Sequence, residues 1–175
     1  PKVESAKTSL TALNPEVEVI VHPVRFHETN AEEIAKGSDF IVDGSDNFDT
    51  KFLVNDLAVK LSIPFSHAGI VRLQGQVMTV VPGKSACYRC LFKVPPPAEE
   101  ILNCQVSGIL GAVAGTIGTI QATEAVKYLA GFEDGLLTDR LLIYDAKNMR
   151  FREIEVRRDP QCAACGTTAD KSATA

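Results

Sequence analysis

Four of the five cysteines form two Cys-x-x-Cys pairs, Cys87 with Cys90 and Cys162 with Cys165. Two such pairs supply four thiolates, the ligand set of a closed tetrahedral zinc site. Because 71 residues separate the pairs, the metal would join distant parts of one domain. Closing a loop of this length costs about 4 kcal/mol plus a constant, whereas structural zinc contributes roughly 10–16 kcal/mol in small peptides. The spacing therefore favours zinc over two disulfides, a redox-active pair or unpaired thiols.

The fifth cysteine, Cys104, lies in a segment (93–107) that has neither a helical nor a strand period. A loop this long inside a compact domain is usually functional. Cys104 also comes just before a predicted helix, and a helix N-terminus favours the thiolate. It is therefore a candidate covalent nucleophile. The sequence reveals no nearby base, so an ordinary loop thiol is the alternative.

The polar stretch Asp43-Gly44-Ser45-Asp46-Asn47 follows an apolar run. Open α/β sheets bind their ligands at the carboxyl ends of parallel strands. Asp46 could hold a magnesium ion on a polyphosphate, since Mg²⁺ prefers one or two carboxylates together with phosphate oxygens. The alternative is helix capping, with Asp46 or Asn47 as the N-cap.

These residues need a scaffold, and hydrophobic periodicity predicts one. The run 39–43 predicts a strand buried on both faces of a parallel sheet, and strand 75–81 follows strand 63–69 without a helix, which favours antiparallel pairing. Helices are expected over 4–13, 31–35, 49–61 and 108–129, and further strands over 17–21, 141–145 and 151–156. The sequence predicts an α/β fold: a Rossmann-like parallel sheet continued by antiparallel strands.

The helix predicted over 108–129 repeats small residues at steps of three and four, which leaves one face nearly bare. Such a face allows close packing, either onto the sheet or against a second copy in a dimer.

Composition restricts the possible partners. The net charge is −4, which does not recommend nucleic acid or an anionic membrane surface as a partner, and no apolar run reaches 18 residues. An odd number of cysteines without a signal peptide favours the reducing cytoplasm. His22, His27 and His67 show no ligand spacing and are expected to be structural or on the surface.

The chain starts at Pro1 without an initiator methionine, and we expect it to be a piece of a longer or split protein. Residues 1–166 are expected to form a single, incomplete domain. Residues 167–175 are small and polar, which is typical of a disordered tail.

Several short motifs occur in one order along the chain: Pro1-Lys2-Val3-Glu4-Ser5-Ala6, Ser45-Asp46-Asn47, Arg72-Leu73-Gln74-Gly75-Gln76, Cys87-Tyr88-Arg89-Cys90, Cys104, Tyr144-Asp145-Ala146 and Cys162-Ala163-Ala164-Cys165-Gly166. Any one of them is weak, but the ordered set is specific. Together they resemble the ThiF/MoeB/HesA family of ubiquitin-activating-enzyme-like adenylyltransferases, over nearly the whole chain.

The resemblance implies an enzyme that uses ATP and magnesium to adenylate the C-terminal glycine of a ubiquitin-like sulfur carrier, as in thiamine or molybdopterin synthesis. A sulfur donor protein would then supply the thiocarboxylate sulfur, and the enzyme would be a homodimer. By position, Lys2 matches a phosphate-contacting lysine. Asp46 matches the aspartate at magnesium and nucleotide, with Asn47 beside it. The cysteine pairs match a zinc tetrad, and Cys104 a loop cysteine that links covalently to the carrier in some members.

The chain also departs from the family. Members carry a glycine-rich phosphate loop, an acidic ribose contact and an Asn/Arg segment before the point at which this sequence starts. We therefore expect the isolated 175-residue chain not to adenylate anything. The competing hypotheses are a non-catalytic, zinc-stabilised module that binds a partner's tail, and redox sensing by the cysteines.

Overall fold

The computed structural model describes residues 1–96 and 108–166 and divides into two compact units, Pro1–Ala35 and Lys36–Ala175. Cys104 and the tail predicted to be disordered both lie outside the described residues. None of the helices in the described ranges is long and apolar enough to cross a membrane.

The first unit holds two helices, α1 (Lys2–Leu13) and α2 (Glu28–Ala35). Helix α1 begins near the predicted residue, and α2 begins three residues earlier than predicted. The strand predicted over 17–21 is wrong: these residues are not in a strand, and Val17 and Ile20 are exposed. An apolar run becomes a strand only where another strand accepts its hydrogen bonds, and no described strand pairs with 17–21.

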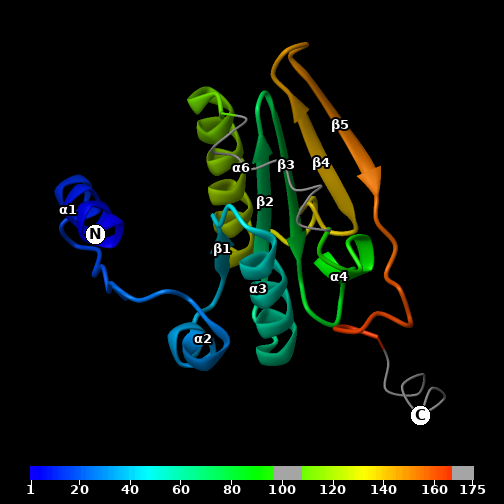
Figure 1. Ribbon diagram of the computed structural model, residues 1–175, viewed down its shortest axis with the longest axis horizontal. Coiled ribbons are helices and arrows are strands. Elements are labelled where there is room, and N and C mark those ends of the chain that lie inside the picture. The colour runs from blue at the N-terminus through cyan, green and yellow to red at the C-terminus, as the bar shows by residue number, and fades with distance from the viewer. Residues whose placement is uncertain (97–107, 167–175) are drawn as a thin grey trace. The chain divides into compact units, whose positions relative to one another are not determined.

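The second unit is built on a five-stranded sheet in the order β1-β2-β3-β4-β5 (Figure 1). The strands are β1 (Ile41–Asp43), β2 (Phe65–Val71), β3 (Gln74–Val80), β4 (Arg140–Asp145) and β5 (Arg150–Glu155). Strand β1 pairs with β2 in parallel, and the other pairs are antiparallel. The predicted change from parallel to antiparallel pairing is confirmed. In the described part of the chain the parallel portion is one pair of strands.

One strand differs from its predicted environment. The run 39–43 was expected to be buried on both faces, but β1 is an edge strand in the described sheet, and Val42 is 52% exposed. Only Asp43 is buried in it. Apolar composition does not distinguish a central strand from an edge strand, since the difference lies in the neighbours.

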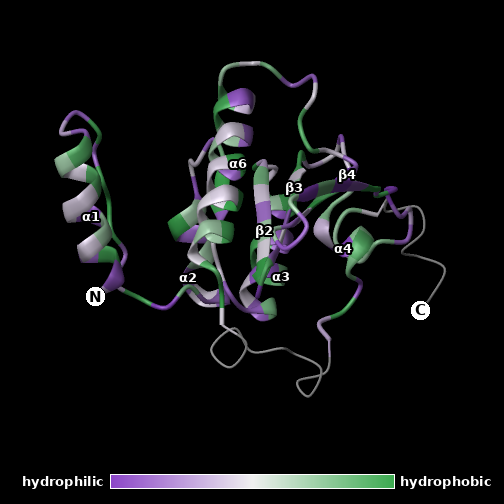
Figure 2. Cartoon of the chain, turned by 90° about the horizontal axis from the view of Figure 1, so that it is seen from above, coloured by the Kyte–Doolittle hydropathy of each residue, from purple (hydrophilic) through white to green (hydrophobic). Residues whose placement is uncertain are grey.

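Helices cover both faces of the sheet (Figure 2). Helix α6 (Gly111–Leu129) places Val113 and Ile117 in a core with Ala68, Val77 and Tyr144 on one face. Helix α3 (Phe48–Leu61) and the short helix α4 (Tyr88–Leu91) lie on the other face. Successive side chains of a strand point to opposite faces, so His67 and Gln76 face the α3–α4 side.

The bare face of α6 does not make the sheet contact. Gly111, Gly115 and Gly118 are exposed, and a Cβ at any of them would meet nothing within 4 Å. Close packing of this stripe onto the sheet is therefore wrong for the described residues. The close approach occurs at Gly75 on β3 instead, where a Cβ would lie 2.3 Å from Ile117 Cγ1.

Candidate functional site

The four paired cysteines come together. Cys87 Sγ lies 3.6 Å from Cys162 Sγ and 3.9 Å from Cys90 Sγ, and Cys90 Sγ lies 3.4 Å from Cys165 Sγ. All four sulfurs lie within 4.8 Å of one another. Four thiolates at a Zn–S distance of about 2.3 Å form a tetrahedron with edges near 3.8 Å. The donor set and its spacing therefore fit one tetrahedral ion.

Burial raises the pKa of the Cys87 thiol and raises that of Cys90 to about 11. Without a cation these sulfurs would remain largely protonated at neutral pH, whereas a coordinated thiol is deprotonated. The turn of the second pair requires a glycine, since a Cβ at Gly166 would lie 2.6 Å from the Cys162 carbonyl oxygen.

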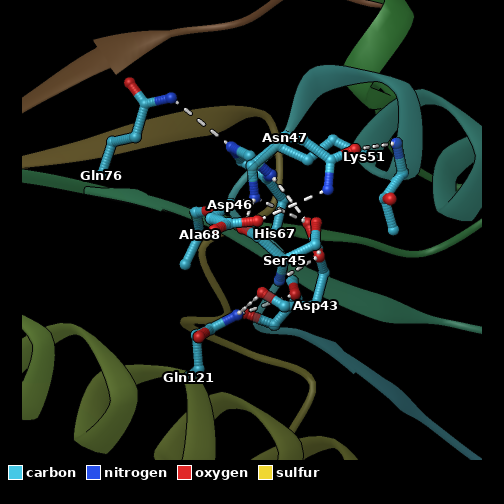
Figure 3. A network of polar contacts seen from close by, with 11 residues as sticks. Asp43, Ser45, Asp46, Asn47, Lys51, His67, Ala68, Gln76 and Gln121 are labelled. Atoms are coloured by element: carbon cyan, nitrogen blue, oxygen red, sulfur yellow. Dashed lines mark hydrogen bonds and ion pairs between the residues drawn. The ribbon is translucent and has the colours of Figure 1, made fainter. Parts of the chain in front are cut away.

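A second cluster lies at the carboxyl end of β1 (Figure 3). Asp43 is buried, and its Oδ2 accepts from Lys51 Nζ at 3.2 Å and lies 3.3 Å from His67 Nδ1. Its Oδ1 accepts from the Ser45 backbone N–H and hydroxyl at 2.9 and 2.6 Å. Gln121 of α6 donates to the Asp43 carbonyl oxygen at 3.0 Å. The carboxylate therefore receives bonds from β2, α3 and its own loop.

Burial by itself would raise the pKa of Asp43. The hydrogen bond from His67, the charge of Lys51 and the bonds from Ser45 outweigh burial and lower this pKa to about 2. The Lys51 ammonium also donates to the carbonyl oxygens of Ser45 (2.7 Å) and Ala68 (2.5 Å). Its three N–H donors are thus used within the protein, so Lys51 fixes the loop and has no donor left for a ligand.

Asp46 and Asn47 follow Asp43 but have different surroundings. Asn47 is the N-cap of α3, because its Oδ1 accepts from the Thr50 N–H at 2.9 Å. The predicted capping alternative is therefore confirmed for Asn47. Asp46 is exposed, and within the described ranges no cation pairs with it. Its Oδ1 accepts one long hydrogen bond, from Asn47 Nδ2 at 3.5 Å. An exposed carboxylate on a fixed loop is the donor type that Mg²⁺ uses together with phosphate oxygens.

Asp46 opens onto a cavity of about 440 Å³ on the α3–α4 side of the sheet. Its lining joins the β1–α3 loop, α4, the end of β2, the start of β3 and the middle of β4 and β5. Polar side chains in the lining include those of Ser45, Asp46, Asn47, Lys51, Gln74, Gln76 and Arg152, and apolar ones include Ile70, Phe92 and Ile143. A larger hollow of about 740 Å³ lies around Lys36, Ser62 and Glu133. It adjoins neither buried cluster, so the cavity beside Asp46 is the candidate site.

One residue connects the cysteine cluster to the Asp43 cluster. Tyr88, between Cys87 and Cys90, packs its ring on His67 with 4.4 Å between centroids and edge-on against Phe52 at 5.1 Å. Its backbone N–H donates to Asn55 Oδ1 at 2.8 Å. The turn that holds two sulfurs therefore also forms part of the cavity wall.

The structure brings together some of the predicted residues and leaves others apart. Asp46 and Asn47 lie at one cavity, and the four cysteines form one cluster. Lys2 lies in the first turn of α1, in the other compact unit. Cys104 lies outside the described residues.

Sequence reasoning missed Lys51 and Gln121, and it left Asp43 and His67 without a role in positioning the site. A signal existed for Gln121, because a polar residue interrupts the apolar positions of α6 four residues after Ile117. Lys51 offered a similar signal, since it is a charged residue three and seven positions before Val54 and Ala58, which places it on their apolar face of α3.

Comparison with known proteins places the chain among relatives. The model of the ThiF family matches residues 1–164. The SAMP-activating enzyme E1 of Haloferax volcanii is 43% identical, over 95% of this chain and 61% of that protein. The sulfur carrier protein adenylyltransferase of Thermus thermophilus is 42% identical, over 95% of this chain and 63% of that protein.

Solved structures agree on the fold. E. coli MccB, in a crystal structure with MccA-N7isoASN, superposes with a TM-score of 0.80 at 20% identity, over 95% of this chain and 51% of that one.

The sequence relatives are longer than this chain. The adenylyltransferase and sulfurtransferase MOCS3 of Drosophila sechellia is 41% identical over 94% of this chain but only 36% of its own length. The chain thus spans less than two thirds of the relatives it matches.

We expect the free energy of unfolding to fall as the pH drops from about 5 towards 2. Asp43 stays ionised in the folded protein down to a pKa of about 2, whereas its ordinary value is 3.8. The ionised Asp43 carboxylate therefore stabilises the folded state by about 2 kcal/mol at any pH above the pKa of this group in the unfolded chain. This contribution is lost as the pH falls through the pKa of Asp43 in the folded protein. Urea denaturation between pH 5 and 2.5 measures it.

Asp43→Asn should lack this part of the pH dependence, while the exposed Asp49→Asn should retain it. Equal pH slopes in the two variants would contradict the role assigned to Asp43.

Proposed function

The chain belongs to the ThiF family, and from that premise we propose that its protein adenylates the C-terminal glycine of a ubiquitin-like sulfur carrier. The observation that supports this most directly is the exposed carboxylate of Asp46, which lines a cavity and stands on a loop fixed by Asp43, Lys51 and His67. The names of the relatives, sulfur carrier protein adenylyltransferase among them, support the same activity.

The chemistry requires a carboxylate to attack a phosphate. An oxygen of the carrier's terminal carboxylate bonds to the α-phosphorus of ATP, the bond from that phosphorus to the bridging oxygen breaks, and pyrophosphate leaves. Negative charge develops on the phosphate oxygens, and preorganised cations and donors lower the barrier. We assign Lys2 and Asn47 to nucleotide contacts, and Asp46 to magnesium. The ion would screen the phosphate charges.

The chain's own contribution is to hold Asp46 in place. Asn47 starts α3, and Lys51, one turn further, anchors Ser45 and Asp43. The backbone of the Asp46 loop is thereby fixed from both sides, while the Asp46 side chain stays exposed. A donor that is fixed before the ligand arrives loses little entropy when the ligand binds.

We assign zinc to the four-cysteine cluster as a structural ion, because a closed thiolate set leaves no open position for a substrate. We assign Cys104 to the covalent link with the carrier that precedes sulfur transfer from a sulfur donor protein. The exposed small-residue face of α6 fits a homodimer contact, and thiamine or molybdopterin synthesis is the proposed pathway, in the cytoplasm. A non-catalytic module that binds a partner's tail is the alternative, because the cavity alone would also accept a peptide.

In the full-length gene product that contains these residues, Asp46→Asn should lower carrier-dependent ATP–pyrophosphate exchange at least 100-fold, because the neutral amide is a poor magnesium ligand. Lys2→Met should reduce the exchange as well, through the lost phosphate contact. Asp49→Asn removes the same charge three residues away and should retain activity. Normal exchange by Asp46→Asn, or none by the wild type, would favour the tail-binding module.

Cys104→Ser in the same protein should slow formation of the carrier thiocarboxylate at least tenfold, because serine is a far weaker nucleophile than a thiolate. Mass spectrometry of the carrier measures the product over time. A thiocarboxylate that forms at the wild-type rate would show that Cys104 is not the nucleophile.

The purified chain should contain about one zinc per molecule, and Cys162→Ser should lose it and unfold at lower urea concentration. Cys104→Ser serves as the matched control and should keep the metal. Replacement by Co²⁺ should give the absorption of tetrahedral thiolate coordination, which needs no assay of activity. Two disulfides found in the freshly purified protein would instead support redox sensing.

A further inference from the structure

One side-chain amide in the cavity has its orientation set by a chain of hydrogen bonds that begins at Asp43. The Asp43 carboxylate is ionised at neutral pH and can only accept hydrogen bonds. His67 Nδ1, at 3.3 Å from Asp43 Oδ2, must therefore carry a proton. Burial lowers the pKa of His67, so the ring is neutral. A neutral imidazole that is protonated on Nδ1 has an acceptor at Nε2.

That acceptor fixes the neighbouring glutamine. Gln76 Nε2 lies 3.4 Å from His67 Nε2, and the contact is a hydrogen bond only if the amide nitrogen faces the ring. A flipped amide would place two acceptors against each other. Gln76 therefore turns its nitrogen to His67 and its oxygen away from it (Figure 3). Within residues 1–96 and 108–166, no donor bonds to Gln76 Oε1.

The surroundings of this oxygen favour a ligand that donates. Gln76 is half-buried in the cavity lining, opposite Gly69 on one side and Ile143 on the other. Gly69 has no side chain and therefore leaves room for the Gln76 amide. Any larger residue would crowd it, because a Cβ at position 69 would lie 3.1 Å from Gln76 Nε2. Ile143 and Phe92 offer no hydrogen bonds. A fixed acceptor in such a wall selects an N–H or O–H group, which carboxylate and phosphate oxygens lack.

We propose that Gln76 Oε1 accepts a hydrogen bond from the backbone N–H of one of the last two peptide bonds of the carrier's C-terminal tail. The inference rests on the proposed function, which places the terminal carboxylate at the Asp46 end of the cavity that Gln76 also lines. Gln76 thus orients the tail, and Asp43 and His67 set the polarity of that contact. A nucleotide also carries amino and hydroxyl donors, so the test separates the two sources.

The test uses the full-length gene product, ATP–pyrophosphate exchange and three carriers. One carrier is unmodified. In the second, glycolic acid replaces the C-terminal glycine, so that an ester removes the last backbone N–H and retains the carboxylate. In the third, the preceding peptide bond is replaced by an ester. Gln76→Met keeps the side-chain length and removes the acceptor.

We expect Gln76→Met to raise KM for the unmodified carrier about tenfold, because a factor of this size corresponds to the loss of one neutral hydrogen bond. KM for ATP should stay unchanged. One of the two esters should raise KM for the wild-type protein by a similar factor. The same ester should add little in Gln76→Met, because the two changes remove the same bond. Gln74→Met, on the same strand face but without a bond to His67, serves as the matched control and should show no such coupling.

Additive effects of Gln76→Met and both esters would overturn the proposal, as would an unchanged KM for the carrier. A shift in KM for ATP alone would assign the acceptor to the nucleotide and overturn the tail contact. These outcomes presuppose exchange by the wild type with the unmodified carrier. If that exchange is absent, the proposed function fails, and the proposal fails with it.

Discussion

The buried carboxylate of Asp43 is the interaction on which the rest of the site depends. It joins the end of β1 to Lys51 of α3 and His67 of β2, and Gln121 of α6 binds its carbonyl oxygen. Removing one partner from a buried charged group typically costs 3–5 kcal/mol, because the remaining charge is left without compensation. Helices on both faces of the sheet therefore bond to Asp43, and these bonds also hold the start of the loop that follows it.

Two aspartates three residues apart consequently have opposite roles. Asp43 is buried and bonded on both oxygens, whereas Asp46 is exposed, forms no ion pair among the described residues and accepts only a long bond from Asn47 Nδ2 at 3.5 Å. The first holds the backbone, and the second is available to a ligand. A lysine that lines a cavity can bind an anionic ligand, but Lys51 has all its donors used inside the fold. Charge type alone would therefore have assigned it the wrong partner.

The four-cysteine cluster is connected to the cavity beside Asp46, although none of its sulfurs lines that cavity. Its first turn contributes Tyr88, which packs on His67 and lines the cavity. One side chain, Tyr88, thus separates the four-cysteine cluster from the hydrogen bonds that orient Gln76. Since a closed thiolate site is rigid, holding the turn of α4 in place also holds one wall of the cavity.

Much of this arrangement follows from sequence alone, because periodicity, cysteine spacing and the ordered motifs are local signals. They predicted the helices α1, α3 and α6, the change from parallel to antiparallel strands and the four-sulfur set. The sequence could not determine that residues 17–21 would lack a strand partner or that β1 would lie at an edge, since both depend on neighbours distant in the chain. It also could not assign Lys51, His67 and Gln76 to one network. Hydrogen bonds to a buried carboxylate and the tautomer they impose exist only once three separate segments meet, and that meeting is decided by the tertiary structure.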